Sequence, residues 1–425
     1  MLQCSHNYQN WKGIFIKTFI NNMRLRLVTS LAFTLILSLQ FTPCYSQDIS
    51  PQNTTDIICG AERMNLYINK LKDKKVALVI NQSARVGDML LVDTLLRLKI
   101  NVVKIFVPEH GLRGQADAGA TIDNGVDSAT GLPVISLYGN NKKPKLEQLT
   151  DVDVIIYDLQ DVGVRFYTYI STLQYVMEAC AKQEKPLIIL DRPNPNGFYI
   201  DGPVLDTTLH SFVGMQPIPI VYAMTAGEYA KMLTGEQWFS NAEKLNLTVI
   251  PCLHYDHSKK YALRYPPSPN LKTMTAVYLY PSLCFFEGTV VSVGRGTEAP
   301  FQQWGHPDFG DKATYSFIPK SNIGSSKPLY EGRTCYGEYI ANKPEDALAA
   351  IDNKISLEWL IKAYNWYPDK EKFFNTFFEK LSGSKTLSAD IKKGMTEKDI
   401  HASWQKDIKH FKNIRKKYLL YADFQ

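Results

Sequence analysis

The sequence predicts an α/β fold: an open, mostly parallel β-sheet with helices on both faces, followed by a smaller α+β domain. Short apolar runs recur up to about residue 250, and they are continuous rather than alternating. Continuous runs are typical of strands that are covered on both faces. Segments with apolar residues at three and four spacing separate them, so strands and helices alternate as in a doubly wound sheet.

The expected elements can be placed along the chain. The predicted strands are residues 75–81, 102–108, 132–138, 151–158, 185–191, 217–223 and 247–252. Helical spacing of apolar residues occurs in 88–98 and 169–182. This order predicts a Rossmann-like domain over residues 47–305.

The pattern changes near residue 305. The breaker cluster GHPDFG is followed by the strand-like pieces TYSFIP and GRTCYGEYI and by a helix-like SLEWLIKAYNWY. The terminal segment carries one apolar stripe with lysines opposite it, formed by Ile400, Trp404, Ile408, Phe411, Ile414 and Tyr418. Such a stripe is typical of an amphipathic helix docked on the body. We expect residues 306–425 to form a smaller α+β domain that closes a cleft.

Residues 1–46 form a leader. From Met23 onward, two arginines precede a mostly apolar run over 27–41, and small residues follow it. This arrangement is typical of a secretory signal, with Met23 as a candidate start, so we expect a bacterial periplasmic or secreted protein. The run is short for a membrane span, so no stable membrane insertion is expected after signal removal. A lipoprotein signal through Cys44 is the less favoured alternative, because Pro43 stands where such signals use a small residue.

Charge and cysteine content exclude some classes. Four of the 48 basic residues lie in the leader, which has no acid, so the body carries 44 basic against 42 acidic groups. A near-neutral body gives no electrostatic footprint for nucleic acid. The five cysteines of the body are widely spaced and form no C-x-x-C pair, which favours buried thiols over disulfides or a metal framework. They are Cys59, Cys180, Cys252, Cys284 and Cys335.

Polar side chains follow three of the predicted strands. In open α/β sheets, ligands bind beyond the carboxyl ends of the strands. The groups at these three ends are Glu109, His110 and Arg113; Asp158, Gln160, Asp161 and Arg165; and Asp191, Arg192, Asn194 and Asn196. Three clusters converging on one edge of a sheet predict a binding or catalytic site there.

Motifs for cofactors are absent. The segment GRGTEA at 294–299 lacks the third glycine of a dinucleotide fingerprint and does not open a helix. Neither a phosphate-binding P-loop nor a G-x-S-x-G serine elbow occurs. The HYDH segment at 254–257 has metal-like spacing but no supporting context. The sequence therefore predicts no cofactor and no metal, and leaves acid–base chemistry by carboxylates.

Glu109 is suited to such chemistry. A glycosidase needs a carboxylic acid that protonates the leaving oxygen, with its pKa raised by a partly apolar pocket. Residues 106–108 (Phe-Val-Pro) supply an apolar wall directly before Glu109, and His110 can orient or polarise it. Arg165, Arg192 and Arg295 can each hold a substrate carboxylate in a bidentate fork.

Nine motifs that occur in a fixed order along the chain are specific enough to point to a family. They are FVPEHGLRGQADAG, TGLPVISLYG, DVDVIIYDLQDVGVRFYTYISTL, LDRPNPNG, DGPVL, SFVGMQPIP, MTAGEYA, PPSPN and EGTVVSVGRGTEAPF. Together they resemble the exo-β-N-acetylmuramidases of the NamZ type, glycoside hydrolase family 171. The resemblance implies an exported peptidoglycan-recycling enzyme that removes N-acetylmuramic acid (MurNAc) from the non-reducing end of MurNAc-GlcNAc saccharides. It also implies a cleft between a Rossmann-like domain and a smaller C-terminal domain.

The resemblance places functional roles on particular residues. The glutamate of its EHG motif is Glu109, expected to act as general acid and then base, with His110 beside it. Other motif positions are Asp158, Gln160, Asp161, Arg165, Tyr167 and Tyr169; Asp191, Arg192 and Asn194; and Glu287, Arg295 and Glu298. In many relatives an HGMT motif stands where this chain has Tyr222 and the three residues after it, which puts the role of that histidine in doubt here.

The expected catalytic set is Glu109, His110, Asp158 and Tyr167, and the other motif residues, with Arg113 and Tyr222, are expected to bind substrate. Arg192 and Arg295 are expected to bind the lactyl carboxylate of muramic acid. The second catalytic group stays open between a carboxylate, such as Asp158 or Asp191, and the 2-acetamido oxygen of the substrate. Two other functions also stay open: a non-catalytic periplasmic muropeptide-binding protein, and a metal-dependent hydrolase that uses Asp158, Asp161 and His110.

Overall fold

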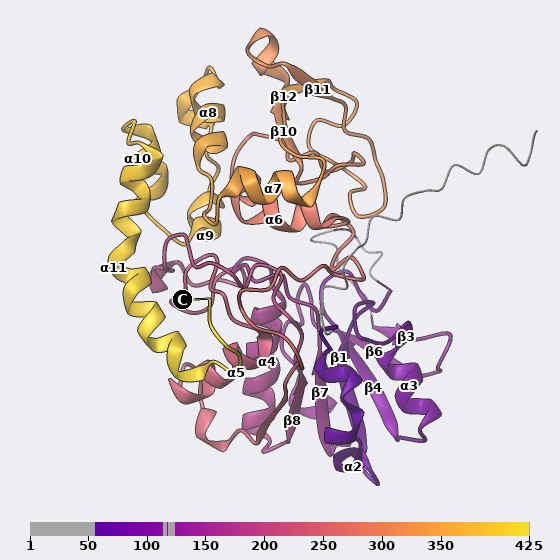
Figure 1. The fold of residues 1–425 in the computed structure, drawn as a ribbon. Coiled ribbons are helices and arrows are strands. Elements are labelled where there is room, and N and C mark those ends of the chain that lie inside the picture. The colour runs from indigo at the N-terminus through magenta and orange to yellow at the C-terminus, as the bar shows by residue number, and fades with distance from the viewer. Residues whose placement is uncertain (1–55, 114–116, 118–123, 425) are drawn as a thin grey trace, which may run out of the picture. The chain divides into compact units, whose positions relative to one another are not determined.

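A seven-stranded sheet forms the centre of the larger, N-terminal part of the fold (Figure 1). The computed structural model describes residues 56–113, 117 and 124–424, and the predicted leader over 1–46 lies outside them. In spatial order the strands are β5 (Gly125–Val126), β6 (Pro133–Ser136), β4 (Val102–Val107), β1 (Val76–Ile80), β7 (Val154–Asp158), β8 (Leu187–Leu190) and β9 (Leu247–Ile250). Every neighbouring pair is parallel except β5 with β6, which confirms the predicted, mostly parallel sheet.

Helices cover both faces of this sheet. The helices are α2 (Ile68–Leu71), α3 (Leu91–Arg97), α4 (Tyr169–Lys182) and α5 (Ala226–Gly235). Successive side chains of a strand point to opposite faces. Ala77 and Val79 of β1 therefore pack in one core cluster with α4 and α5, whereas Val76 and Leu78 pack in a second cluster with α2 and α3. The two buried faces explain why the strands are continuous apolar runs.

Two of the predicted elements differ from the structure. The run 217–223 does not join the sheet, and its Val221 forms only isolated bridges with Val164 and Asp201. The run is apolar because it is buried, and a short apolar run does not distinguish a strand from other buried backbone. The helix predicted from residue 88 begins only at Leu91, since β2 (Arg85–Val86) and β3 (Met89–Leu90) form a short hairpin before it.

The C-terminal part of the chain has a small antiparallel sheet and several helices. Its strands are β10 (Gln303–His306), β12 (Cys335–Tyr339) and β11 (Tyr315–Phe317), in that spatial order. Its helices are α7 (Pro344–Ile351), α8 (Glu358–Trp366), α9 (Phe378–Ser382), α10 (Leu387–Lys392) and α11 (Glu397–Arg415). Helix α6 (Met274–Leu283) precedes this sheet and packs against α7. The predicted domain boundary between residues 305 and 306 stays a prediction.

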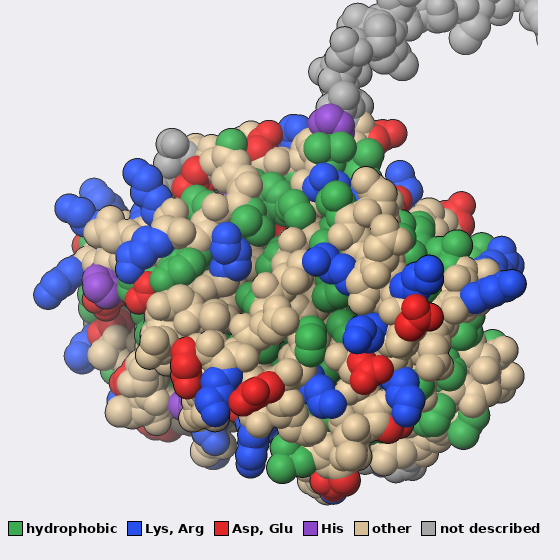
Figure 2. Space-filling view, turned by 90° about the horizontal axis from the view of Figure 1, so that it is seen from below, with side chains coloured by type: hydrophobic (Ala, Val, Ile, Leu, Met, Phe, Trp, Pro, Cys, Tyr) green, Lys and Arg blue, Asp and Glu red, His purple; other side chains and the backbone are tan. Residues whose placement is uncertain are grey.

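The terminal segment is the docked amphipathic helix that its stripe predicts. Ile400, Trp404, Ile408 and Phe411 of α11 are buried. The five cysteines of the described residues are buried and unpaired, as their spacing predicts. No helix in the described part of the chain is long and apolar enough to cross a membrane. On the face seen in Figure 2, basic and acidic side chains are interspersed, as a near-neutral body leads one to expect.

Candidate active site

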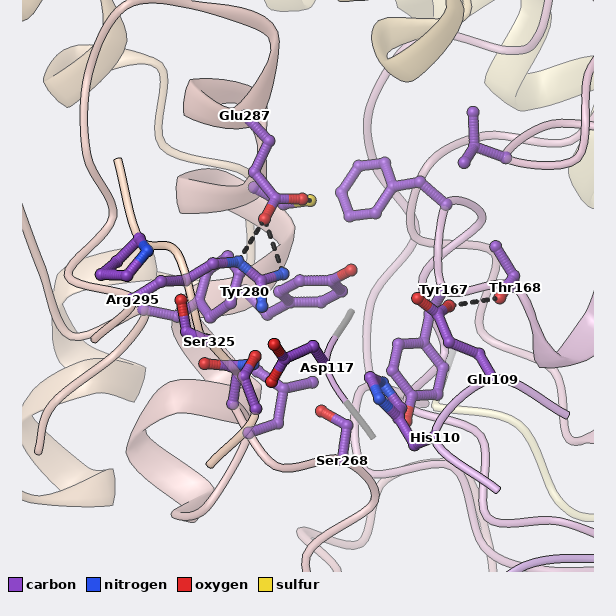
Figure 3. Close-up of a pocket in the computed structure, with 18 of the residues that line it drawn as sticks. Glu109, His110, Asp117, Tyr167, Thr168, Ser268, Tyr280, Glu287, Arg295 and Ser325 are labelled. Carbon is purple, nitrogen blue, oxygen red and sulfur yellow. Dashed lines mark hydrogen bonds and ion pairs between the residues drawn. The ribbon is translucent and has the colours of Figure 1, made fainter. Parts of the chain in front are cut away.

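A cavity of about 500 Å³ lies where the carboxyl edge of the large sheet meets the C-terminal part of the chain (Figure 3). The sheet side contributes Glu109 and His110 after β4, Tyr138 after β6, and Tyr167 and Thr168 after β7. The other walls are formed by segments far along the sequence, with Ser268, Asn270, Tyr280, Glu287, Arg295, residues 324–329, Phe377 and Leu381. This is the edge at which open α/β sheets bind ligands.

A tight turn brings Glu109 to the cavity. Strand β4 ends at Val107, and the N–H of Gly111 donates to the carbonyl of Pro108 at 3.1 Å. His110 and Gly111 both have a φ of 73°. A left-handed backbone costs a non-glycine residue about 1 kcal/mol, so the surrounding structure must hold His110 in place. The strained turn places both side chains of the Glu-His pair in the cavity wall.

Arg295 and Glu287 form the opposite wall, as Figure 3 shows. Nε and Nη2 of Arg295 donate to one oxygen of Glu287, at 2.7 and 2.6 Å. Burial disfavours the charge of Arg295, but Glu287 outweighs it and raises the pKa of this guanidinium. Nη1 of Arg295 is buried and has no hydrogen-bond partner among the described residues. A buried donor without a partner costs about 1–3 kcal/mol, so an anion that accepts from Nη1 would be favoured here.

A second acid, Asp117, lines the same cavity. Its carboxylate accepts a hydrogen bond from the N–H of Ser326 at 2.8 Å. Hydrogen bonding to Ser326 lowers the pKa of Asp117, so this acid is ionised at neutral pH. Glu109, Asp117 and Glu287 are therefore the carboxylates that the described residues contribute to the cavity wall.

Two family models match the chain. The model described as the N-terminal part of the exo-β-N-acetylmuramidase NamZ matches residues 76–275, and the corresponding C-terminal model matches residues 278–421. The chain belongs to the NamZ family. This membership confirms the resemblance that the ordered motifs predict.

Individual relatives agree with this membership. The peptidoglycan β-N-acetylmuramidase NamZ of Bacillus subtilis (strain 168) is 35% identical over 380 residues, which cover 84% of this chain and 89% of the relative. The crystal structure of a DUF1343 family protein from Bacteroides fragilis NCTC 9343 is similar with a TM-score of 0.80 at 44% identity, covering 87% of this chain and 100% of that chain. A second such protein from the same strain has a TM-score of 0.69 at 31% identity, with coverages of 86% and 99%.

Several motif residues of this NamZ-family chain lie outside the cavity. Asp158, at the end of β7, pairs with Arg192 through Nε and through Nη2, the latter at 2.9 Å, and both side chains are buried. Burial disfavours the charge of Arg192, but Asp158 outweighs it and raises the pKa of the guanidinium. The structure thus joins the predicted catalytic acid and the predicted substrate-binding arginine to each other, away from the cavity wall.

Asp161 is paired with Tyr222. The hydroxyl of Tyr222 donates to the carboxylate of Asp161, and the N–H of Gly163 donates to it at 2.7 Å. Burial raises the pKa of Asp161 to about 6. Its neighbour Gln160 donates to the backbone carbonyls of Asp161 and Pro193. None of these side chains lines the cavity.

The remaining buried motif residues hold loops together. Arg165 donates to the carbonyls of Pro203 and Ile218, each at 2.8 Å, and to that of Ser382 in α9. Burial without a carboxylate lowers the pKa of Arg165 to about 9. Asn194 donates to the carbonyl of Met224 at 2.9 Å.

Asp191 anchors a helix start and the chain terminus. It accepts from the hydroxyl of Thr225 at 2.7 Å, from the N–H of Gly227 at 2.8 Å and from the hydroxyl of Tyr421 at 2.5 Å. Burial raises the pKa of Asp191 to about 6. Asp191 does not line the cavity, so its partners are those of a structural carboxylate.

Two tyrosines connect the sheet side to a loop of the cavity wall. Tyr167 and Tyr169 both donate to the carbonyl of Pro267, at 3.0 and 3.2 Å. This carbonyl belongs to the PPSPN loop, whose Asn270 donates to the carbonyl of Gly324 at 2.7 Å. Tyr167 lines the cavity, whereas Tyr169 stands behind it. The RFYTY and PPSPN motifs therefore fix the shape of the cavity together.

The other predicted residues are peripheral. Arg113 pairs with Asp127 at 2.8 Å and is half exposed, and the side chain of Glu298 is 97% exposed. Neither lines the cavity. In the HYDH segment, His254 is exposed while His257 is buried against Glu228. The described residues contain no group of three or more His, Cys, Asp or Glu side chains arranged to hold a metal ion.

Several residues of the cavity wall are not among those predicted from the sequence to bind substrate or to act in catalysis. They are Asp117, Tyr138, Thr168, Ser268, Asn270, Ser325 and Lys327. Tyr138 could have been found, because it is the last residue of the predicted strand 132–138, and Thr168 could have been found because it directly follows Tyr167 in the RFYTY motif. The residues after 320 had no such signal, since they lie in an irregular loop that only the packing of the C-terminal part brings to the sheet edge.

Proposed function

We propose that this protein is an exo-acting β-N-acetylmuramidase that releases MurNAc from the non-reducing end of peptidoglycan fragments, with Glu109 as general acid and base. The observation that supports this most is the position of Glu109, which lines the cavity opposite the guanidinium of Arg295. The Bacillus subtilis relative carries the name of a peptidoglycan β-N-acetylmuramidase. The predicted export signal suits an enzyme that acts on wall fragments outside the cytoplasm.

In the proposed reaction, protonated Glu109 gives its proton to the glycosidic oxygen while the bond to the anomeric carbon breaks. Glu109 then accepts a proton from the water that attacks the anomeric carbon. Asp158 and Asp191 do not line the cavity, so neither is favoured as the second group. The choice narrows to a carboxylate of the cavity wall or the 2-acetamido oxygen of the substrate.

Arg295 supplies the proposed selection for muramic acid. Its Nη1 donor is buried without a partner, and the lactyl carboxylate is the group that distinguishes muramic acid from glucosamine. A charged acceptor on this donor would be bound strongly, and a sugar without the carboxylate would leave the donor unpaired. Arg192 is less suited to this role, because Asp158 already occupies its guanidinium.

Replacement of Glu109 tests the proposed function. With a MurNAc-GlcNAc disaccharide as substrate, Glu109→Gln should lower kcat about 100-fold to 10,000-fold, which is the usual contribution of a general acid. Product release is measured by chromatography, and circular dichroism checks the fold. Glu243→Gln, at an exposed glutamate outside the predicted site, is the matched control and should keep the wild-type rate.

Two results would overturn the proposal. Near-normal turnover by Glu109→Gln would remove Glu109 from the chemistry. Tight calorimetric binding of the disaccharide by the wild-type protein without product would make it a binding protein. A comparison of matched muramic acid and glucosamine glycosides tests Arg295 separately, and equal rates on both would contradict the carboxylate selection.

A further inference from the structure

We propose that Tyr138 and Thr168 are positioning residues, whose hydroxyls hold the carboxylate of Glu109 in the cavity wall. The inference rests on the proposed function, because it concerns the same carboxylate. It is carried by three elements, β4, β6 and the start of α4, whose ends meet at Glu109. Neither hydroxyl was recognised from the sequence.

Strand register brings Tyr138 beside Glu109. Strands β4 and β6 are parallel neighbours in which Val107 is opposite Ser136, and the N–H of Leu137 donates to the carbonyl of Val107 at 2.7 Å. Glu109 and Tyr138 each come two residues after this matched pair. Parallel strands that end in register deliver the residues after them to the same edge of the sheet. Both side chains accordingly line the same cavity.

The phenol of Tyr138 lies in the same cavity wall as the carboxylate of Glu109. Burial raises the pKa of Tyr138, and Glu109 raises it further through its charge and as the acceptor of a hydrogen bond from the phenol. The phenol therefore stays protonated at neutral pH. The ring of Tyr138 is packed beside Phe212, with centroids 6.2 Å apart, so its direction is restricted.

The side chain of Thr168 does not cap helix α4, although Thr168 is its N-cap residue. At this position a threonine hydroxyl normally accepts a hydrogen bond from the helix backbone. The side chain of Thr168 makes no such cap bond and instead donates to Oε2 of Glu109 at 3.3 Å, as the dashed line in Figure 3 shows. The start of a helix also carries positive partial charge, which favours an anion nearby.

Both hydroxyls favour the carboxylate over the carboxylic acid. A donor that bonds to the charged form lowers the pKa of an acid, whereas an apolar wall such as Phe166 raises it. The other titratable or charged groups that the described residues contribute to the cavity wall are His110, Asp117, Tyr167, Tyr280, Cys284, Glu287, Arg295 and Lys327, and Tyr138→Phe and Thr168→Val both leave them unchanged.

The test is the pH profile of kcat/KM on a MurNAc-GlcNAc disaccharide. A general acid must be protonated, so activity falls at high pH as Glu109 loses its proton. Removal of a donor in Tyr138→Phe or Thr168→Val should move this high-pH limb upward by about one pH unit, because the carboxylate loses a hydrogen bond that favours it over the carboxylic acid. The maximal rate should fall about tenfold, because the acid is weaker. On an aryl glycoside with an acidic leaving group the rate loss should be much smaller.

Matched variants separate positioning from simple packing. Thr168→Ser restores a hydroxyl and should return the wild-type limb. Tyr175→Phe is the control for Tyr138, because Tyr175 stacks against the same Phe212 at 6.0 Å but does not line the cavity. If the tyrosine variant does not fold, the threonine pair still decides the question.

The outcomes are distinct. An unchanged high-pH limb in folded Thr168→Val overturns the inference while wild-type activity leaves the proposed function standing. Loss of rate without movement of the limb also overturns it, since packing alone would explain that result. An inactive wild-type protein refutes the proposed function itself.

Discussion

At the scale of single residues, acids at the ends of different strands lie at the same sheet edge but have different surroundings: one lines the cavity and another is buried in an ion pair. Glu109 is turned into the cavity by the strained His110 turn. Asp158 is turned into the core, where Arg192 neutralises it. Sequence spacing is similar in both cases, so the direction of the side chain depends on the path of the loop and on the partner it meets.

Replacement of Arg192 tests whether its pair with Asp158 is structural. Arg192→Leu leaves Asp158 buried without its partner, and it should lower the free energy of unfolding by about 3–5 kcal/mol. Urea denaturation followed by fluorescence measures the change. Arg113→Leu is the control at a half-exposed pair with Asp127, and it should cost about 1 kcal/mol or less. A stable Arg192 variant with a strongly raised KM would instead return Arg192 to substrate binding.

At the scale of elements, three helices beside the large sheet are each followed by a residue other than glycine in the left-handed conformation. Lys99, Glu184 and Gln237 follow α3, α4 and α5 with φ values of 60°, 52° and 52°. After α3, the N–H of Ile100 donates to the carbonyl of Leu95, and α4 and α5 are closed by equivalent bonds. This is the Schellman arrangement, in which glycine normally takes the left-handed position. Without a glycine these helix ends cannot be read from the sequence.

Glycine at these positions should stabilise the protein. Lys99→Gly and Gln237→Gly each relieve a left-handed backbone at an exposed position, and we expect each to add about 0.5–1 kcal/mol to the free energy of unfolding. The measurement is the shift of the urea midpoint. Thr94→Gly, in the middle of α3, is the opposite control and should cost about 1 kcal/mol. Equal losses in all three variants would show that the left-handed strain is negligible.

At the scale of the whole described molecule, the C-terminal helix α11 forms polar contacts with the N-terminal part of the chain. Arg415 of α11 donates through Nε and Nη2 to the carbonyl of Ala223, at 2.9 and 2.7 Å, and pairs with Asp423. His401 at the start of α11 contacts Asp201 at 3.3 Å. The contacts with Ala223 and Asp201 join segments about two hundred residues apart along the sequence.

The contact between His401 and Asp201 makes the free energy of unfolding dependent on pH. Burial opposes its charge, but Asp201 and Glu397 outweigh burial and raise the pKa of His401 to about 9. The folded-state pKa is above the unfolded value of about 6.5, so the stabilisation is complete below pH 6.5 and is lost as the pH rises to 9. We expect the free energy of unfolding to fall by about 2 kcal/mol over this interval.

Denaturation in urea at pH 6 and at pH 9.5 measures this loss. In His401→Gln the difference between the two pH values should shrink by about that amount, because the titrating group is gone. His410→Gln, at an exposed position of the same helix, should keep the wild-type difference. An unaltered pH dependence in His401→Gln would assign the loss to other groups.

Local patterns were sufficient for much of this protein. Continuous apolar runs predicted the parallel strands, ordered motifs predicted the family, and the acid after a buried strand predicted Glu109 as a cavity residue. These features are readable because burial on both faces and the edge of a parallel sheet impose their own residue types nearby in the sequence. The packing of distant segments settled the rest. It paired Asp158 with Arg192, brought the Arg295–Glu287 pair to the cavity wall opposite Glu109 and kept the run 217–223 out of the sheet. The direction and partner of a buried side chain depend on such nonlocal contacts.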